Sequence, residues 1–168
     1  MAVYVMGDVH GCFNAVQQIL KQINLKTGDR LYLVGDYVDR GSQSAKVLSW
    51  LESCPRNVFP VKGNHDIEFA QGISLMQQID ISAALLTDYD SVKDTKNLYA
   101  TTRYAIKSNN SDLLKYFDYY DTIRKMIEED EVPFSKLKQW AAMIESYPFY
   151  YKFPFRDREC VVVHAGYM

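Results

Sequence analysis

The residues of this chain best suited to chemistry lie in four short loops, each of which follows an apolar segment. The loops contain all three histidines of the 168-residue chain, together with aspartates, an asparagine and an arginine. They are Gly7-Asp8-Val9-His10-Gly11, Gly35-Asp36-Tyr37-Val38-Asp39-Arg40-Gly41, Gly63-Asn64-His65-Asp66 and His164-Ala165-Gly166. Chance rarely places every histidine of a chain in such loops, so the four loops form one candidate site.

Carboxylates and imidazoles in this arrangement suit a divalent metal ion such as manganese, iron or zinc. Asp8 and His10 are separated by one residue, so both can reach a single ion from one extended turn. The Asp36 carboxylate can bridge two ions, and Asn64 and His164 would bind the second ion from the other side. Two ions about 3.5–4 Å apart clamp a phosphate and lower the pKa of a bridging water, which becomes the nucleophile.

Three further side chains fit the proton transfer and phosphate binding that such a reaction requires. His65, beside Asn64, is placed to protonate the leaving oxygen. Asp39 would orient that imidazole and favour its protonated form. Arg40 has a planar guanidinium that matches phosphate oxygens bidentately.

Each of these residues also has an ordinary structural interpretation. Asp8 fits a helix cap, Asp36 and Asp39 fit turns that their side chains stabilise, and Arg40 fits a surface cation. The segment 64–66 resembles the capped start of a helix. These interpretations are adequate one at a time, but they do not explain why all three histidines share the four loops.

An alternation of strands and helices positions the loops. Apolar runs at 3–6, 31–34 and 58–62 predict buried strands, and a fourth run at 160–163 precedes His164. One helix is expected after each of the first two loops, from the spacing of Phe13, Val16, Leu20 and Ile23 and of Val47, Leu51 and Cys54. Ser42 or Ser44 is a candidate N-cap of the second helix, and Pro60 moves the third strand toward a sheet edge or a bulge. This β-α-β-α-β order predicts an α/β fold with a parallel sheet, and we expect all four strands to deliver their loops to one edge.

The segment 67–133 has a different character, because strand signals disappear and tyrosines are scattered through a polar sequence. The helical period of Leu113, Phe117, Tyr120, Ile123 and Ile127 predicts a helical insertion. A second interpretation is that some of its tyrosines line a substrate cleft: Tyr89, Tyr99, Tyr104, Tyr116, Tyr119 and Tyr120. Ser135 then caps a further helix that Pro148 stops, and an aromatic segment, 149–155, leads to the last strand.

Composition and charge narrow the class of protein. A hydrophobic content of 48% and a charged content of 24% are ordinary for a globular protein, and a net charge of −2 gives no reason to expect a nucleic-acid or membrane partner. Three widely spaced cysteines do not make a disulfide framework and fit a reducing compartment. The first strand begins almost at Met1 and no apolar run approaches the roughly 20 residues of a membrane span. We therefore expect a cytoplasmic protein with no signal peptide.

The four motifs, in this order and after strands, resemble the signature motifs of calcineurin-like metallophosphoesterases, and within them the phosphoprotein phosphatase branch. The resemblance implies an α/β/β/α sandwich and a hydrolase that uses two divalent ions, with manganese the first candidate. It assigns Asp8, His10 and Asp36 to the first ion and Asp36, Asn64 and His164 to the second. It also makes His65 the general acid, Asp39 its partner, and Arg40 and Asn64 phosphate-binding residues.

Departures from the family pattern bear on the substrate. Asp66 stands where Ser/Thr protein phosphatases usually have glutamate, and the last motif is His-Ala-Gly rather than the eukaryotic His-Gly-Gly. Both features look bacterial and are also similar to symmetrical diadenosine tetraphosphate hydrolases, although those typically have another residue at the position of Asp39. The preferred interpretation is a phosphoserine/phosphothreonine phosphatase acting on a phosphorylated protein or small phosphoester. The alternative enzyme is a dinucleoside polyphosphate hydrolase. The alternative that is not an enzyme is an inactive fragment or a non-catalytic binding domain.

The family pattern also bears on the extent of the chain. Family members continue past His-Ala-Gly to a further metal-binding histidine and a phosphate-binding arginine. Residues 1–168 are therefore expected to be a single metallophosphoesterase domain that is incomplete at its C-terminus.

Overall fold

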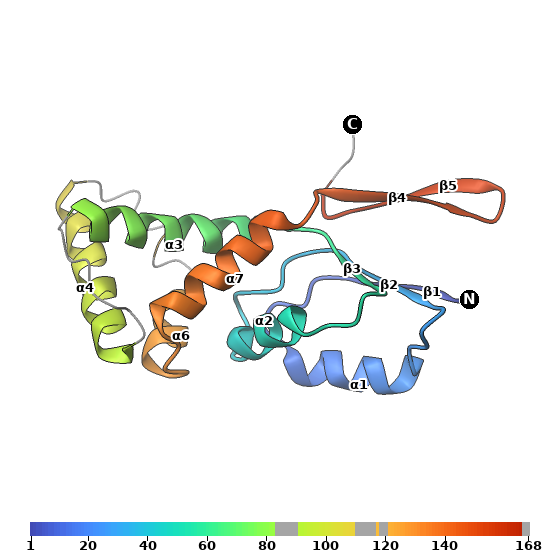
Figure 1. Cartoon of the computed structure of the whole chain (residues 1–168), viewed down its shortest axis with the longest axis horizontal. Helices are drawn as coiled ribbons and strands as arrows, with labels where there is room; N and C mark the ends of the chain where they lie inside the picture. Colours follow the sequence, from blue (N-terminus) through green and yellow to red (C-terminus); the bar gives the residue numbers. More distant parts are fainter. Residues whose placement is uncertain (83–90, 110–116, 118–120, 166–168) are drawn as a thin grey trace. The chain divides into compact units, whose positions relative to one another are not determined.

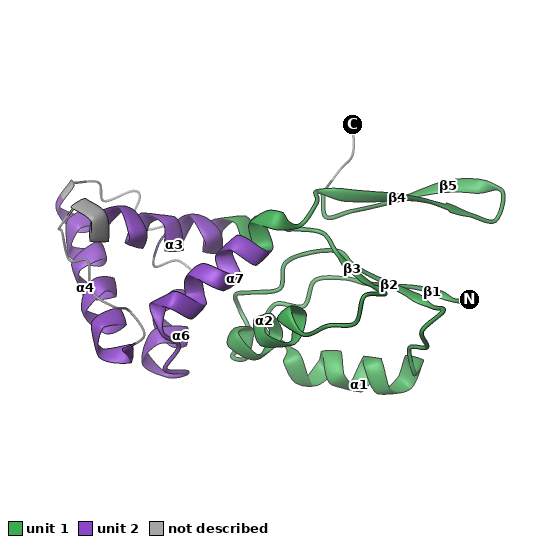
Figure 2. Ribbon diagram, viewed as in Figure 1, with its two compact units in different colours: residues 1–67, 144–168 green, residues 68–143 purple. Residues whose placement is uncertain are grey.

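The computed structural model of the chain describes residues 1–82, 91–109, 117 and 121–165. It divides into two compact units, coloured separately in Figure 2. The α/β unit contains Met1–Ile67 and Ile144–Met168, and the helical unit contains Glu68–Met143. All eight residues that the sequence analysis assigns to the candidate site, from Asp8 to His164, belong to the α/β unit.

The α/β unit begins with three short parallel strands in the order β1-β2-β3. The strands are β1 (Val3–Met6), β2 (Arg30–Leu33) and β3 (Val58–Pro60), with Tyr32 opposite Val5 in one pair and opposite Phe59 in the other. Helix α1 (Phe13–Ile23) connects β1 to β2, and α2 (Ser44–Glu52) connects β2 to β3. The predicted β-α-β-α-β start of an α/β fold is confirmed. Pro60 lies in an edge strand of this sheet, where its missing N–H interrupts no ladder.

Helices α1 and α2 lie on one face of the sheet (Figure 1). They bury an apolar side against it, namely Val16, Val47, Leu48 and Leu51. The expected serine cap of α2 is wrong, because the residue before the helix is Gln43 and it makes no side-chain cap. The Gln43 backbone N–H instead donates to the Gly11 carbonyl at 3.0 Å. A contact between two loops, rather than a local cap, therefore sets the start of α2.

The C-terminal part of the α/β unit is a hairpin of two antiparallel strands, β4 (Tyr150–Phe155) and β5 (Arg158–Val163). We expected four strands to deliver their loops to one edge of one sheet. This is wrong for the fourth strand, which does not belong to the parallel sheet. The strand predicted at 160–163 is longer and belongs to a separate two-stranded sheet. The aromatic segment before it supplies the partner strand, and the tight turn at Arg156, with a φ of 55°, makes antiparallel pairing possible without a crossover.

Aromatic rings join the hairpin to the parallel sheet, on the face away from α1 and α2 (Figure 1). The buried ring of Tyr32 stacks on Phe153 of the hairpin, with centroids 4.4 Å apart and planes 7° apart. It also stacks on Phe59 of β3 at 5.1 Å. The three-stranded and the two-stranded sheet of the α/β unit are thus held together largely by one aromatic cluster.

The helical unit is built from α3 (Asn64–Ser82), α4 (Val92–Asn109), α6 (Thr122–Glu128) and α7 (Phe134–Ser146), of which α3 begins and α7 ends in the α/β unit. Its buried side chains include Phe69, Ile73, Met76, Leu98, Met126, Ile127, Phe134 and Leu137. Several residues of the predicted insertion, Leu113 and the tyrosines Tyr89, Tyr116, Tyr119 and Tyr120, lie outside the described residues. None of the helices described is both long and apolar enough to cross a bilayer.

The Tyr32 cluster generates a stability prediction. Replacing Tyr32 with alanine removes a ring that contacts both sheets and leaves a cavity, so Tyr32→Ala should lower the free energy of unfolding by about 3–5 kcal/mol. Denaturant titration measures the change. The matched control is Tyr104→Ala, since the Tyr104 side chain is 75% exposed, and it should stay within about 0.5 kcal/mol of wild type. Equal effects of the two changes would contradict the role of Tyr32.

Candidate metal centre

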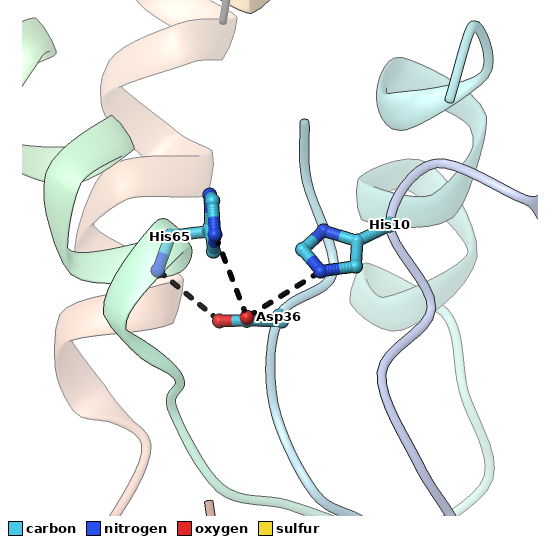
Figure 3. A group of neighbouring side chains, drawn as sticks. All are labelled: His10, Asp36 and His65. Carbon is cyan, nitrogen blue, oxygen red and sulfur yellow. Dashed lines mark hydrogen bonds and ion pairs between the residues drawn. The ribbon is translucent and has the colours of Figure 1, made fainter. Parts of the chain in front are cut away.

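Asp36 lies at the centre of the candidate site. It follows β2, is 3% exposed and adopts a left-handed φ of 53°. Three imidazoles approach its carboxylate. The Nε2 atoms of His10 and His65 lie 3.5 and 3.8 Å from Oδ2, and the Nε2 atom of His164 lies 3.4 Å from Oδ1. Figure 3 shows the Asp36 carboxylate between His10 and His65, with the backbone N–H of His65 also donating to it at 3.1 Å.

His10 is held in a position that suits a metal ligand. Its Nδ1 atom is 2.8 Å from the Val38 carbonyl, so in the neutral ring Nδ1 carries the proton and Nε2 keeps its lone pair. That Nε2 atom is buried and has no hydrogen-bond partner among the described residues. An unpaired buried polar atom is costly, and a cation between His10 and Asp36 would satisfy both groups. The residues present therefore fit a divalent metal ion.

Asp8 lies at the open side of the site. Its side chain is 50% exposed, and its Oδ2 atom is 3.9 Å from Nε2 of His10. Its other oxygen is 4.0 Å from Nδ1 of His164. The structure thus brings the first and last of the four loops together, although nearly the whole chain separates them.

His164 reaches the site from β5, in the separate hairpin. Its Nδ1 atom is 2.8 Å from the carbonyl of Val34, directly after β2, and its Nε2 atom is 3.0 Å from Oδ1 of Asn64. These contacts place Asn64, His164 and Asp36 side by side, as the sequence predicted for a second ion. Gly166, the last residue of the fourth motif, lies outside the described residues.

His65 has partners on both ring nitrogens. Its Nδ1 atom is 2.8 Å from Oδ2 of Asp39, and both side chains are buried. Its Nε2 atom is 3.4 Å from Nη2 of Arg40, whose side chain reaches it from an exposed position. The Asp39 carboxylate fixes the orientation of the ring by accepting the Nδ1 proton, which leaves Nε2 facing Asp36 and the guanidinium.

The loops approach each other so closely that glycine is required at their contact. A Cβ atom on Gly63 would lie 2.1 Å from Oδ1 of Asp36 and 2.5 Å from its backbone nitrogen. Gly35 has a φ of +97°, and a Cβ there would lie 2.6 Å from the nitrogen of Gly63. The absence of both side chains lets the Asp36 carboxylate lie against the start of α3.

The Asp66 carboxylate joins the same two loops, and sequence reasoning gave it no role at the site. It accepts hydrogen bonds from the backbone N–H groups of Asp36 and Tyr37, both at 2.8 Å, and of Gly63 at 2.9 Å. Burial raises the pKa of Asp66 to about 6, against the lowering effect of these N–H donors. The bond to Gly63, three residues earlier, is a capping-box contact, so the sequence signal existed but indicated only the helix start.

This close contact predicts that alanine substitution destabilises the protein at Gly63 but not at Gly28. Gly63→Ala should shift the Asp36 loop and lower the free energy of unfolding by about 1–3 kcal/mol, because the added methyl group overlaps the carboxylate. Gly28→Ala is the matched control, since a Cβ there meets nothing within 4 Å and Gly28 is not among the glycines with positive φ. It should be neutral or slightly stabilising. Thermal and denaturant unfolding of both variants tests this, and a neutral Gly63→Ala would contradict it.

Comparisons with known proteins agree with this geometry. The family described as calcineurin-like phosphoesterase matches residues 1–165. The chain is 36% identical over 94 residues to "Bis(5'-nucleosyl)-tetraphosphatase, symmetrical" of Nitrosococcus oceani, covering 54% of this chain and 34% of the relative. It is 47% identical over 68 residues to the protein of the same name from Chromobacterium violaceum, covering 40% of this chain and 24% of the relative. The chain thus spans about a third or less of the length of these curated relatives.

A solved protein serine/threonine phosphatase from Saccharomyces cerevisiae is 18% identical, with 89% of this chain and 37% of that chain covered and a TM-score of 0.39. A superposition this loose supports no conclusion about the site. The family match, in contrast, extends over nearly all of the sequence, and it confirms the resemblance seen in the four motifs. The chain belongs to the calcineurin-like phosphoesterase family.

Proposed function

We propose that this chain forms the metal-binding part of a phosphoesterase that hydrolyses dinucleoside polyphosphates. The observation that carries the proposal is the buried Asp36 carboxylate, which the Nε2 atoms of His10 and His164 approach at 3.5 and 3.4 Å. Family membership makes divalent metal ions the expected occupants, because calcineurin-like phosphoesterases use them.

Two sets of residues would hold the ions. Asp8, His10 and Asp36 form the first set, and Asp36, Asn64 and His164 form the second. Oxygen and imidazole nitrogen ligands suit manganese, with iron and zinc as alternatives. When bound, the ions supply Lewis acidity toward the phosphate and a lowered pKa for a coordinated water.

The remaining residues would bind phosphate and move a proton. Arg40 offers a guanidinium beside Nε2 of His65, and the exposed Asn64 offers the N–H groups of its side-chain amide. His65 would protonate the leaving phosphate oxygen through Nε2, since its Nδ1 atom is engaged by Asp39. Asp39 would thus act by positioning His65.

The names of the relatives favour a dinucleotide substrate over a phosphorylated protein. The relatives reported above are called symmetrical bis(5'-nucleosyl)-tetraphosphatases, and a phosphoprotein substrate has no comparable support. Asp39 argues against a dinucleotide substrate at the level of sequence, because symmetrical diadenosine tetraphosphate hydrolases typically have another residue at this position. Its contact with His65 orients an acid that either substrate requires, so the contact itself does not distinguish between them.

The candidate metal centre predicts stabilisation by manganese. Mn²⁺ should raise the melting temperature and a chelator should reverse the rise, because an ion that binds only the folded state adds about 2.7 kcal/mol at roughly 100 times its Kd. Asp36→Asn should remove most of the effect, since Asp36 belongs to both ligand sets. The exposed Asp157→Asn serves as control and should keep the effect in full. A melting temperature indifferent to Mn²⁺ and chelator would contradict the metal centre.

A hydrolysis assay tests the substrate and the acid together. With Mn²⁺ present, the phosphoesterase that contains this metal-binding part should convert diadenosine tetraphosphate to ADP, with a kcat/KM above that for a phosphoserine peptide. His65→Asn should lower kcat by roughly 10²–10⁴ while Mn²⁺ stabilisation is retained. Preference for the phosphopeptide would favour the protein phosphatase instead, and loss of Mn²⁺ stabilisation in His65→Asn would make His65 a metal ligand rather than the acid.

A further inference from the structure

A large cavity opens in the α/β unit at the edge of the parallel sheet opposite Asp36. Its volume is about 1000 Å³. It is lined by residues before β1, at the starts of β2 and β3, in the last turns of α1 and α2, and in the loops that follow these helices. The loops of the candidate metal centre leave the other ends of the same strands, so the two sites do not share a residue. Figure 1 shows α1 and α2, each of which contributes to the lining from its last turn, together on one face of the sheet.

The charge of the cavity is opposite to that of the chain. Four cationic side chains line it, Lys21, Lys26, Arg30 and Arg56. None of the four forms an ion pair within the described part of the chain, and Arg30 is half-buried. The single carboxylate in the lining, Asp29, is occupied by the backbone N–H groups of Ala2 at 2.7 Å and Lys26 at 3.2 Å. The Asp29 carboxylate also interacts electrostatically with Lys26. A chain with a net charge of −2 thus gathers three further cationic side chains around one cavity.

Helix dipoles account for only part of this charge. The C-terminus of a helix favours a nearby cation, and Lys21 in the last turn of α1 fits that explanation. The last turn of α2 contains no basic residue. Lys26, Arg30 and Arg56 lie in loops or at the start of β2, outside both helices. Since Lys26 has Asp29 as a charged neighbour, Arg30 and Arg56 are the two lining cations with neither a helix end nor a carboxylate beside them in the described part of the chain.

The cavity also has an aromatic wall and a fixed loop. The Trp50 side chain is half-buried in the lining, and its indole N–H has no hydrogen-bond acceptor among the described residues. The side-chain amide of Asn57 donates to the carbonyls of Lys26 and Asp29, both at 3.0 Å. These bonds tie the 26–29 loop to the start of β3, so the cavity is already formed without a ligand.

We propose that this cavity is a second, non-catalytic site that binds a mononucleotide. The phosphates would contact the four cations and the base would lie against Trp50. A single phosphate would leave most of a cavity of this volume empty, and an apolar ligand would leave the cations unpaired. The proposal is independent of the proposed function, because it concerns binding at the opposite edge of the sheet and requires neither metal nor turnover.

Calorimetric titration with ADP tests the proposal, in the presence of a chelator so that the metal centre contributes no bound ion. The wild-type chain should bind one ADP. The double variant Lys21→Glu/Lys26→Glu should bind at least tenfold more weakly, because two exposed cations become anions. Lys46→Glu is the matched control, since Lys46 is exposed on α2 but does not line the cavity, and its affinity should stay within twofold of wild type.

Trp50 variants test the position of the base. ADP should change the tryptophan fluorescence of the wild type. Trp50→Phe should bind ADP with similar affinity but without this signal, whereas Trp50→Leu should bind several-fold more weakly. Circular dichroism shows whether each variant keeps its secondary structure. If Trp50→Leu does not fold, the variant of the two exposed lysines still tests the proposal.

Three results would overturn the proposal. The first is no detectable ADP binding, or binding unchanged in the lysine double variant. The second is binding that Arg40→Ala abolishes, since the nucleotide would then occupy the candidate metal centre. The third is inorganic phosphate binding as tightly as ADP, which would show a simple anion site without recognition of the base.

Discussion

The candidate site depends on the buried carboxylate of Asp66. It receives backbone N–H groups from two loops that follow different strands, at Asp36 and Tyr37 on one and Gly63 on the other. Burying a carboxylate costs several kcal/mol unless its oxygens are hydrogen-bonded, and three donors at 2.8–2.9 Å offset that cost. The same bonds hold Asp36 at a positive φ, a conformation that costs non-glycine residues about 1 kcal/mol or more. One side chain thereby fixes the distance between the second and third loops.

The position of Asp36 determines the electrostatics of the site. Its carboxylate is nearly inaccessible to water and has an imidazole on three sides, at 3.4–3.8 Å. The Nδ1 atom of His10 is engaged by the Val38 carbonyl, so the lone pair of its Nε2 atom, which has no hydrogen-bond partner among the described residues, is directed at the carboxylate. Lone pairs facing a carboxylate repel unless a proton or a cation intervenes. This arrangement is unfavourable as a purely structural core and favourable around divalent ions.

Much of this organisation could be predicted from sequence because it rests on local signals. Apolar runs ending in Gly-Asp or Gly-Asn indicate strand ends, and parallel strands bring their carboxyl ends together, so the grouping of Asp8, His10, Asp36, Asn64 and His65 follows from order alone. The order of the strands does not predict how His164 reaches the site. The aromatic segment Tyr150–Phe155 has no simple alternation of polar and apolar residues, and only its pairing with β5 shows it to be a strand. His164 reaches Asp36 from another sheet because the Tyr32 ring stacks against Phe153.

The start of α2 and the role of Asp66 were missed for a related reason. Sequence signals for helix caps assume that the cap is local, whereas the position of Gln43 is set by a bond to Gly11 in another loop. Asp66 was visible as a helix-start residue, but its bonds to Asp36 and Tyr37 join residues about 30 positions apart. Contacts between loops decide both cases, and a single sequence has no local signal for them.

The two edges of the parallel sheet have opposite electrostatic character for a common reason. Each β-α-β connection begins its helix where a strand ends, so α1 and α2 start just after the first two loops of the candidate metal centre, and α3 starts within the third. Their N-termini carry partial positive charge, which stabilises the Asp36 carboxylate and any phosphate bound beside it. The C-termini of α1 and α2 then necessarily lie at the other edge with partial negative charge, where a cation is tolerated at low cost. The topology that supports anions at one edge thus permits cations to gather at the other, and only one of the four lining cations, Lys21, lies in the last turn of a helix.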